Sequence, residues 1–225
     1  MSHPGEFVVL KRRYWTGAFP MWNNWVKDPA EARRVVEMVE EANLQSHPTD
    51  RPIWFVAHSN GAVIALLAAR ELIAKGHRIG GLILTGAACE ADLNKNCILQ
   101  WYAEEKIGSA IAYCSECDGV VAGDPLAVTT AKASRVLKVL WRMKDWIWGR
   151  LMWPYGCLGR TGFLIREQPA SRDRIFTRWF EGYGHSGYFE PENREKVFEQ
   201  FYEDIREGHR QTEKGITRPM MINNA

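Results

Sequence analysis

The feature that most constrains the fold is the alternation of short, unbroken apolar runs with longer segments of helical pattern. Five runs have the length and composition of strands, at residues 7–10, 53–57, 82–84, 110–113 and 175–180. Unbroken apolar runs are typical of strands that are buried on both faces. Strands that alternate with helices form right-handed βαβ units. The sequence therefore predicts an α/β fold, with a mostly parallel sheet of about five to six strands flanked by helices.

The segments between the runs carry helix start and stop signals. The first predicted helix begins at Asp28, which suits an N-cap, with Pro29 at the first helical position and Glu31 three residues after the cap. Gly76 is placed to end the helix that follows the second run. Further helices are predicted near residues 91–106, from about 126 to 148, and over 191–207.

The length of 225 residues suits one domain with a core of its own. We expect a single domain over residues 1–207, in which about 124–172 form either a cap or an extended helical insertion. A polar tail is expected over residues 208–225. Neither an internal repeat nor an interdomain linker is visible in the sequence.

Three polar side chains follow three of the predicted strands. Ligands of parallel α/β sheets bind outside the carboxyl ends of the strands. Ser59 follows the second run, Asp118 follows the fourth and His185 follows the fifth. Ser59 lies on a strand-to-helix turn with small residues two positions away on each side, and such a sharp turn requires them because larger neighbours would clash. We expect the three side chains on one rim of the sheet.

These residue types suit nucleophilic catalysis. A serine hydroxyl is a weak nucleophile, so it needs a base within hydrogen-bond reach and an acid that orients the base. The turn places Ser59 at a helix N-terminus, where the backbone N–H of Asn60 can donate to a developing oxyanion. No metal or organic cofactor is implied. Cys114 and Cys117 form a lone pair of thiols where zinc needs four ligands, so we interpret them as packing residues.

The segment WFVAHSNGAVIALLAA resembles the nucleophile elbow of the α/β-hydrolase superfamily, usually G-x-S-x-G, with Ala57 in place of the first glycine. The order Ser59, Asp118, His185 and the sequences around the last two are similar to the family's acid and histidine loops. The resemblance covers roughly residues 50–207. It implies a minimal α/β-hydrolase fold and a carboxylesterase or lipase-like serine hydrolase. Ser59 would be the nucleophile, His185 the base, Asp118 its orienting acid and Asn60 an oxyanion donor.

Other interpretations of the same residues remain open. Glu116 and Asp124 compete with Asp118, which is favoured because Gly-Val-Val follows it. Ser59 can be an ordinary helix cap, and His185 a loop residue without a role. The same triad also suits a thioesterase, an amidase or an acyltransferase. A non-catalytic binding protein with a hydrolase-like fold is a further alternative.

The front of the chain departs from the superfamily pattern. Only 58 residues precede Ser59, and the His-Gly expected after the first strand is absent. Either a front portion has been lost or the fold is natively minimal. We expect residues 7–10 to form a strand parallel to the elbow strand, because no other upstream run can fill that place. The loop that follows would supply the second oxyanion N–H, from Tyr14 or Trp15.

A second departure is the distance of 67 residues between Asp118 and His185, which is longer than small members of the superfamily commonly need. The excess contains the tryptophan-rich stretch 141–155. This stretch is either a surface helix packed on the sheet or an apolar face. Such a face would cap the acyl pocket, contact lipid or form a homodimer through an aromatic surface.

Net charge and hydropathy limit the classes of partner that the chain is expected to bind. The chain has 29 Lys and Arg against 27 Asp and Glu, so its net charge of +2 favours neither nucleic acid nor an anionic membrane. The start of the chain lacks the pattern of a signal peptide, and no apolar run reaches the roughly 18 residues that span a bilayer. We therefore expect a cytoplasmic protein without a transmembrane segment, whose partner is a small-molecule acyl ester.

Overall fold

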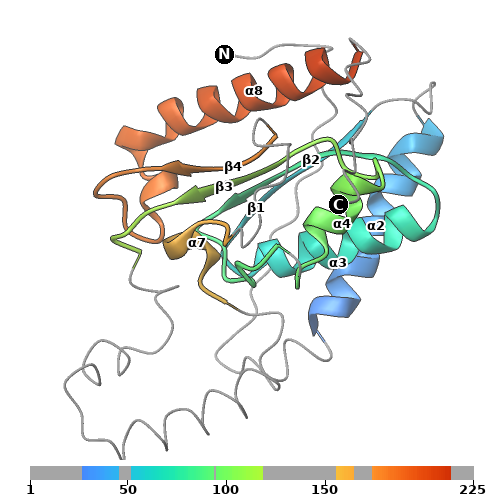
Figure 1. Ribbon diagram of the computed structural model, residues 1–225, viewed down its shortest axis with the longest axis horizontal. Coiled ribbons are helices and arrows are strands. Elements are labelled where there is room, and N and C mark those ends of the chain that lie inside the picture. Colours follow the sequence, from blue (N-terminus) through green and yellow to red (C-terminus); the bar gives the residue numbers. More distant parts are fainter. Residues whose placement is uncertain (1–26, 46–51, 94, 119–155, 165–173, 214–225) are drawn as a thin grey trace, which may run out of the picture.

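The computed structural model describes residues 27–45, 52–93, 95–118, 156–164 and 174–213. These residues form an α/β fold around a four-stranded parallel sheet (Figure 1). The strands are β1 (Ile53–His58), β2 (Ile79–Thr85), β3 (Ala110–Cys114) and β4 (Ile175–Trp179), and they are adjacent in chain order. The predicted fold class is confirmed.

The number of strands is lower than the five to six predicted, because the described residues contain four. The expected strand at residues 7–10 lies outside the described part of the chain, as do the expected helix at 126–148 and the tryptophan-rich stretch 141–155.

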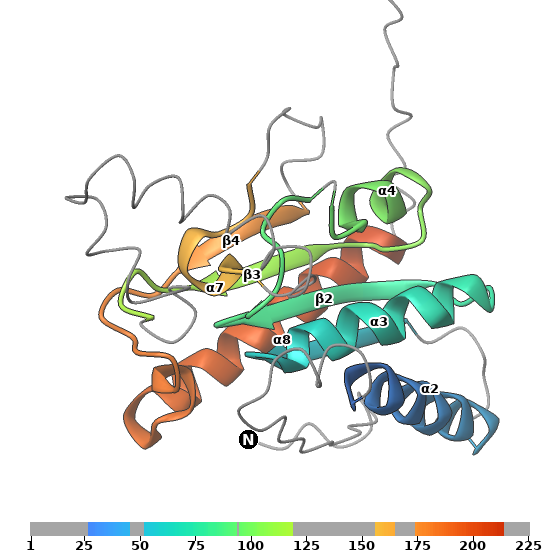
Figure 2. The same cartoon turned by 90° about the horizontal axis from the view of Figure 1, so that it is seen from below.

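Helices cover both faces of the sheet (Figure 2). On one face lie α2 (Asp28–Gln45), α3 (Gly61–Ala74) and the short α4 (Ile98–Ala103). On the other face lies α8 (Pro191–Glu213), which follows a 3-10 turn at Gly187–Phe189. The short α7 (Leu158–Thr161) lies near the end of β3.

Alternate residues of the strands divide the core between these two layers. Leu82 and Leu84 of β2 pack in the cluster that includes α2 and α3. Ile83, which lies between them, joins Tyr113 and the α8 residue Phe201 on the opposite face. This alternation explains why the strands have unbroken apolar sequences, since both faces of the sheet are covered.

Helix α3 is almost entirely apolar because it lies between the sheet and α2. It ends where the sequence predicts. Gly76 has a φ of +92°, its N–H donates to the carbonyl of Ile73 at 3.0 Å, and the N–H of His77 donates to Leu72 at 2.9 Å. This pair of hydrogen bonds is common where a helix ends at a glycine.

Helix α4 is shorter than the predicted 91–106, because it begins only at Ile98. The amide of Asn96 accepts a hydrogen bond from the N–H of Ile98 at 3.1 Å and donates to the carbonyl of Glu90 at 3.0 Å. Cys97 has a φ of +66°, which a helix interior does not contain. Side-chain bonds to the backbone therefore replace the expected first turns with a loop.

Helix α8 continues to Glu213, so the tail boundary expected at residue 208 lies within the helix. Gly208 does not end the helix. Its missing side chain lets the helix backbone lie close to Trp54. A Cβ at Gly208 would lie 2.6 Å from the indole ring of Trp54. No helix among the described residues is long and apolar enough to cross a membrane.

Candidate active site

The turn between β1 and α3 holds Ser59 in a rare backbone conformation. Its φ is +55°, in the left-handed region that residues other than glycine seldom adopt. The N–H of Ser59 donates to the carbonyl of Thr85 at 3.1 Å, and its carbonyl accepts from Ala62 and Ala88, each at 3.1 Å. The strain persists because hydrogen bonds from α3 and from the end of β2 fix both backbone groups.

The structure brings Ser59, His185 and Asp118 together in one chain of hydrogen bonds. Nε2 of His185 lies 2.9 Å from Oγ of Ser59. Nδ1 of His185 lies 2.9 and 3.0 Å from the two carboxylate oxygens of Asp118. An ionised carboxylate only accepts, so Nδ1 carries the proton and the lone pair of Nε2 faces the hydroxyl. The site lies at the carboxyl ends of β1, β3 and β4.

Burial distinguishes the two described acids that follow β3. The side chain of Asp118 is fully buried, whereas Glu116 is exposed. A turn directs Asp118 inward, since its N–H donates to the carbonyl of Ser115 at 3.1 Å and the N–H of Cys117 donates to the Ser115 hydroxyl at 3.2 Å. It is therefore Asp118 that reaches His185. The other competitor, Asp124, lies outside the described residues.

Gly86, directly after β2, makes room for this carboxylate. A Cβ there would lie 3.1 Å from Oδ2 of Asp118 and 3.2 Å from the ring of His58, and the φ of Gly86 is +48°. Both observations disfavour any side chain at this position. The sequence analysis missed Gly86. The available signal was a glycine directly after a predicted strand, at the edge of the sheet where Ser59 lies.

His58, the residue before the serine, packs beside the candidate base. The ring centroids of His58 and His185 are 4.7 Å apart, and Phe189 meets His58 edge-on at 5.0 Å. Nδ1 of His58 lies 3.0 Å from the carbonyl of Thr85, so it carries the proton of the neutral ring. Burial, followed by the charge of His185, lowers the pKa of His58 to about 4. His58 is thus a neutral neighbour of His185 at pH 7.

Asn60 begins α3 and presents its backbone N–H beside Ser59. Within the described residues this N–H has no acceptor, and it lies at the positive end of the helix dipole. These are the properties that an oxyanion donor needs. Its side chain does not cap α3. Instead Nδ2 donates to Oδ1 of Asp28 at 3.1 Å. Tyr14 and Trp15, the residues expected to supply a second donor, lie outside the described residues.

The two thiols at and after the end of β3 occupy different environments. Cys114 is fully buried and its thiol donates to the carbonyl of Leu158 at 3.0 Å, while Cys117 is exposed. Burial raises the pKa of Cys114 to about 12. Among the described residues no cluster of His, Cys, Asp and Glu side chains could hold a metal ion.

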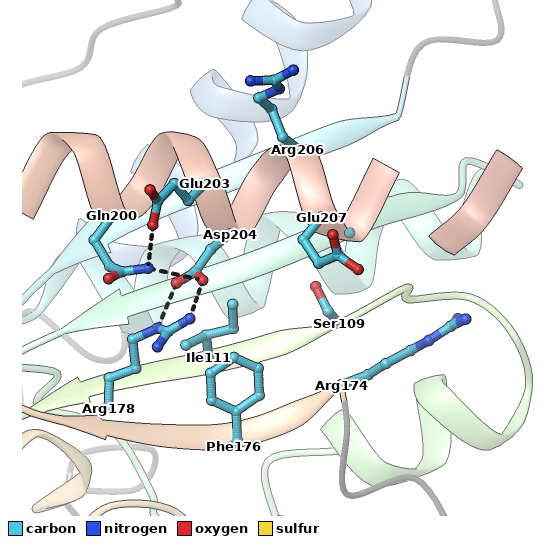
Figure 3. Close-up of a pocket in the computed structure, with 11 residues that line it drawn as sticks. Ser109, Ile111, Arg174, Phe176, Arg178, Gln200, Glu203, Asp204, Arg206 and Glu207 are labelled. Carbon is cyan, nitrogen blue, oxygen red and sulfur yellow. Dashed lines mark hydrogen bonds and ion pairs between the residues drawn. The ribbon is translucent and has the colours of Figure 1, made fainter. Parts of the chain in front are cut away.

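A cavity of about 430 Å³ lies elsewhere, between α8 and strands β3 and β4 (Figure 3). Its lining runs along the α8 face of these strands, from Ser109 and Arg174, which directly precede them, to Arg178 near the end of β4. Ser59, Asp118 and His185 are not among its lining residues, so the cavity is not the substrate pocket of Ser59.

No protein-family model and no curated protein matches the chain. Among solved structures, the chain is similar to the type II thioesterase BorB from the borrelidin biosynthetic cluster. The two share 12% sequence identity over 78% of this chain and 70% of that chain, with a TM-score of 0.37. At this TM-score the likeness carries no conclusion about this chain.

Proposed function

We propose that the protein is a serine hydrolase that cleaves carboxylic esters, with Ser59 as its nucleophile. The observation that carries the proposal is the continuous chain of hydrogen bonds from Asp118 through His185 to Ser59. The strained turn at Ser59 adds support, because a helix cap or a loop histidine requires neither this backbone conformation nor a buried acid on the far side of the ring.

The geometry suits a two-step reaction. Oγ of Ser59 attacks the acyl carbon while Nε2 of His185 takes its proton, and the oxyanion accepts a hydrogen bond from the N–H of Asn60. Asp118 stabilises the imidazolium through Nδ1. His185 then protonates the leaving alcohol, and the acyl group remains bound to Ser59 as an ester, the acyl-enzyme. In the second step His185 deprotonates a water, which hydrolyses this acyl-enzyme and releases the acid.

The neutral state of His58 fits this cycle. His185 becomes positively charged in each transition state, and a charged ring 4.7 Å away would oppose that change. With its pKa lowered to about 4, His58 stays uncharged at the pH at which His185 works as a base.

The test is hydrolysis of p-nitrophenyl esters from acetate to palmitate by the wild type and by Ser59→Ala. We expect turnover in the wild type and its loss in the variant, and the chain-length profile will size the acyl pocket. The exposed neighbour of the base gives a matched control, since Ser186→Ala removes a hydroxyl without touching the triad. An active Ser59→Ala variant would identify another nucleophile.

Substrate comparison separates the related activities. A thioesterase, an amidase or an acyltransferase would use the same three residues and differ in the leaving group or the acceptor. Thioester, amide and alcohol-acceptor substrates are therefore assayed beside the esters. A folded wild type that turns over none of them would favour a non-catalytic binding protein.

A further inference from the structure

Asp28 is a buried carboxylate at the start of a helix. The sequence predicts an ordinary N-cap, a position that normally faces water. In the structure Asp28 is 0% exposed. A carboxylate in such a place costs free energy unless hydrogen bonds compensate for the lost water. One of its partners is the side-chain amide of Asn60, from a different helix and 32 residues away in the chain.

Asn60 uses its side chain in an unusual way. Asparagine at a helix N-cap normally accepts a hydrogen bond from the first turn, but Asn60 makes no such bond. Its Nδ2 donates to Asp28, while its buried Oδ1 has no hydrogen-bond partner among the described residues. Within that part of the chain, one hydrogen bond holds the side chain, and it joins Asn60 to α2.

The peptide between Ser59 and Asn60 carries the proposed oxyanion donor. Its carbonyl end is fixed by the N–H groups of Ala62 and Ala88. Its N–H end must stay free for the oxyanion, so no acceptor can hold it directly. The carbonyl of Asn60 accepts from the N–H groups of Val63 and Ile64 at 3.0 and 3.4 Å. The bond to Asp28 is the remaining restraint on the Asn60 side chain within the described part of the chain.

We propose that Asp28 is a positioning residue, which aims the N–H of Asn60 at the oxyanion by holding the Asn60 side chain. The inference rests on the proposed function. A hydrogen bond to a carboxylate is stronger and more directional than one between neutral groups. Its loss would release the Asn60 side chain and allow the start of α3 to shift, at a position where small displacements weaken transition-state binding.

The test uses kcat and KM for the best p-nitrophenyl ester, together with the rate at which a fluorophosphonate labels the protein. We expect Asp28→Ala to lower kcat and the labelling rate about 10- to 100-fold, with KM within about threefold of the wild type. Glu31→Gln is the matched control, because it removes a buried carboxylate of the same helical turn that forms an ion pair with Arg34. It should keep wild-type kcat.

A reciprocal exchange keeps the test informative if Asp28→Ala does not fold. Asn60→Asp alone places two carboxylates face to face and should lower kcat at least tenfold. Asp28→Asn/Asn60→Asp restores an amide opposite a carboxylate and should recover at least fivefold of that loss. A purely structural role would change the unfolding midpoint without this recovery of kcat.

The outcomes distinguish failure of the positioning role of Asp28 from failure of the hydrolase proposal. An active wild type with unchanged kcat in Asp28→Ala overturns the positioning role and leaves the hydrolase proposal intact. An equal loss of kcat in Asp28→Ala and Glu31→Gln also overturns it, because the effect would then belong to the helix as a whole. If the wild type neither turns over esters nor reacts with the fluorophosphonate, both the positioning role and the hydrolase proposal are overturned.

Discussion

Buried polar groups are paired on the face of the sheet that α8 covers and are left available at its carboxyl edge. On the α8 face, Arg178 forms an ion pair with Asp204 (Figure 3), and the hydroxyl of Tyr113 donates to the same carboxylate at 2.5 Å. These groups satisfy one another. At the carboxyl ends, the hydrogen-bond chain stops at the Ser59 hydroxyl, and the nearby Asn60 N–H has no acceptor among the described residues.

This contrast shows which structural features of the molecule support a reactive site. The cavity of about 430 Å³, with six charged side chains in its lining, lies on the α8 face. The strained backbone of Ser59 lies at the carboxyl edge. In the proposed hydrolase, reactivity depends on groups that the fold holds in place without satisfying them, and none of the three proposed catalytic residues lines the cavity.

The largest expected effect is loss of activity at the carboxyl ends. Asp118→Asn should lower kcat about 10⁴-fold, because an amide no longer fixes the tautomer of His185. Glu116→Gln is the control, since that carboxylate is exposed two residues away and should retain wild-type kcat. Steady-state ester hydrolysis measures both. Equal kcat values in the two variants would contradict the role of Asp118.

On the α8 face the expected effect is on stability. Asp204→Ala leaves the guanidinium of Arg178 and the buried hydroxyl of Tyr113 without their shared acceptor, and should lower the free energy of unfolding by about 3 kcal/mol. Glu203→Ala, at an exposed position beside it, should change it by less than about 0.5 kcal/mol. Urea unfolding gives both values. Loss of kcat in folded Asp204→Ala would remove the distinction between the α8 face and the carboxyl edge.

His58 should make stability depend on pH. Its pKa is lowered from 6.5 to about 4 on folding, so the unfolded chain binds its proton first as the pH falls. Its contribution to stability is complete above pH 6.5 and is lost as the pH falls toward 4. Between pH 7.5 and 4.5 this loss amounts to about 2 kcal/mol.

The measurement is urea unfolding at both pH values for the wild type and for His58→Asn, whose amide can still donate to Thr85. The variant should lose about 2 kcal/mol less than the wild type over this range. The same loss in both proteins would mean that His58 accepts a proton in the folded state as readily as in the unfolded state.

The smallest expected effect concerns the turn itself. A Cβ added at Gly61 would lie 4.0 Å from the Cβ of Ala57, which is ordinary contact, so one methyl group fits where the sequence analysis expects larger neighbours to clash. Gly61→Ala should keep kcat within about threefold and raise stability by about 0.5 kcal/mol, because alanine favours the helix. A variant that unfolds or loses activity would show that the turn tolerates no added atom.

The sequence predicted the features that depend on local pattern. Unbroken apolar runs identified the four described strands, and the rule that ligands bind at carboxyl ends selected Ser59, Asp118 and His185 before their distances were available. The order of these three residues along the chain can be read from the sequence without any information on packing. The Gly-Val-Val that follows Asp118 favoured it over Glu116, and Asp118 is the buried one of the two.

The features that escaped prediction depend on contacts between distant elements. The bond between Asp28 and Asn60 joins the starts of two helices, and no periodicity links those positions. The space that Gly86 leaves for Asp118 appears only once β2 and β3 are neighbours. The first part of the helix predicted at 91–106 was lost to side-chain bonds of Asn96, which compete with helix formation without altering the apolar pattern.

The most direct test of the central claim is to map where a fluorophosphonate reacts. The wild type is incubated with the probe, digested and analysed by peptide mass spectrometry, beside Ser59→Ala and His185→Ala. We expect one adduct, on the peptide that contains Ser59, absent in Ser59→Ala and formed far more slowly in His185→Ala. An adduct on another serine, or equal labelling of the wild type and His185→Ala, would contradict it.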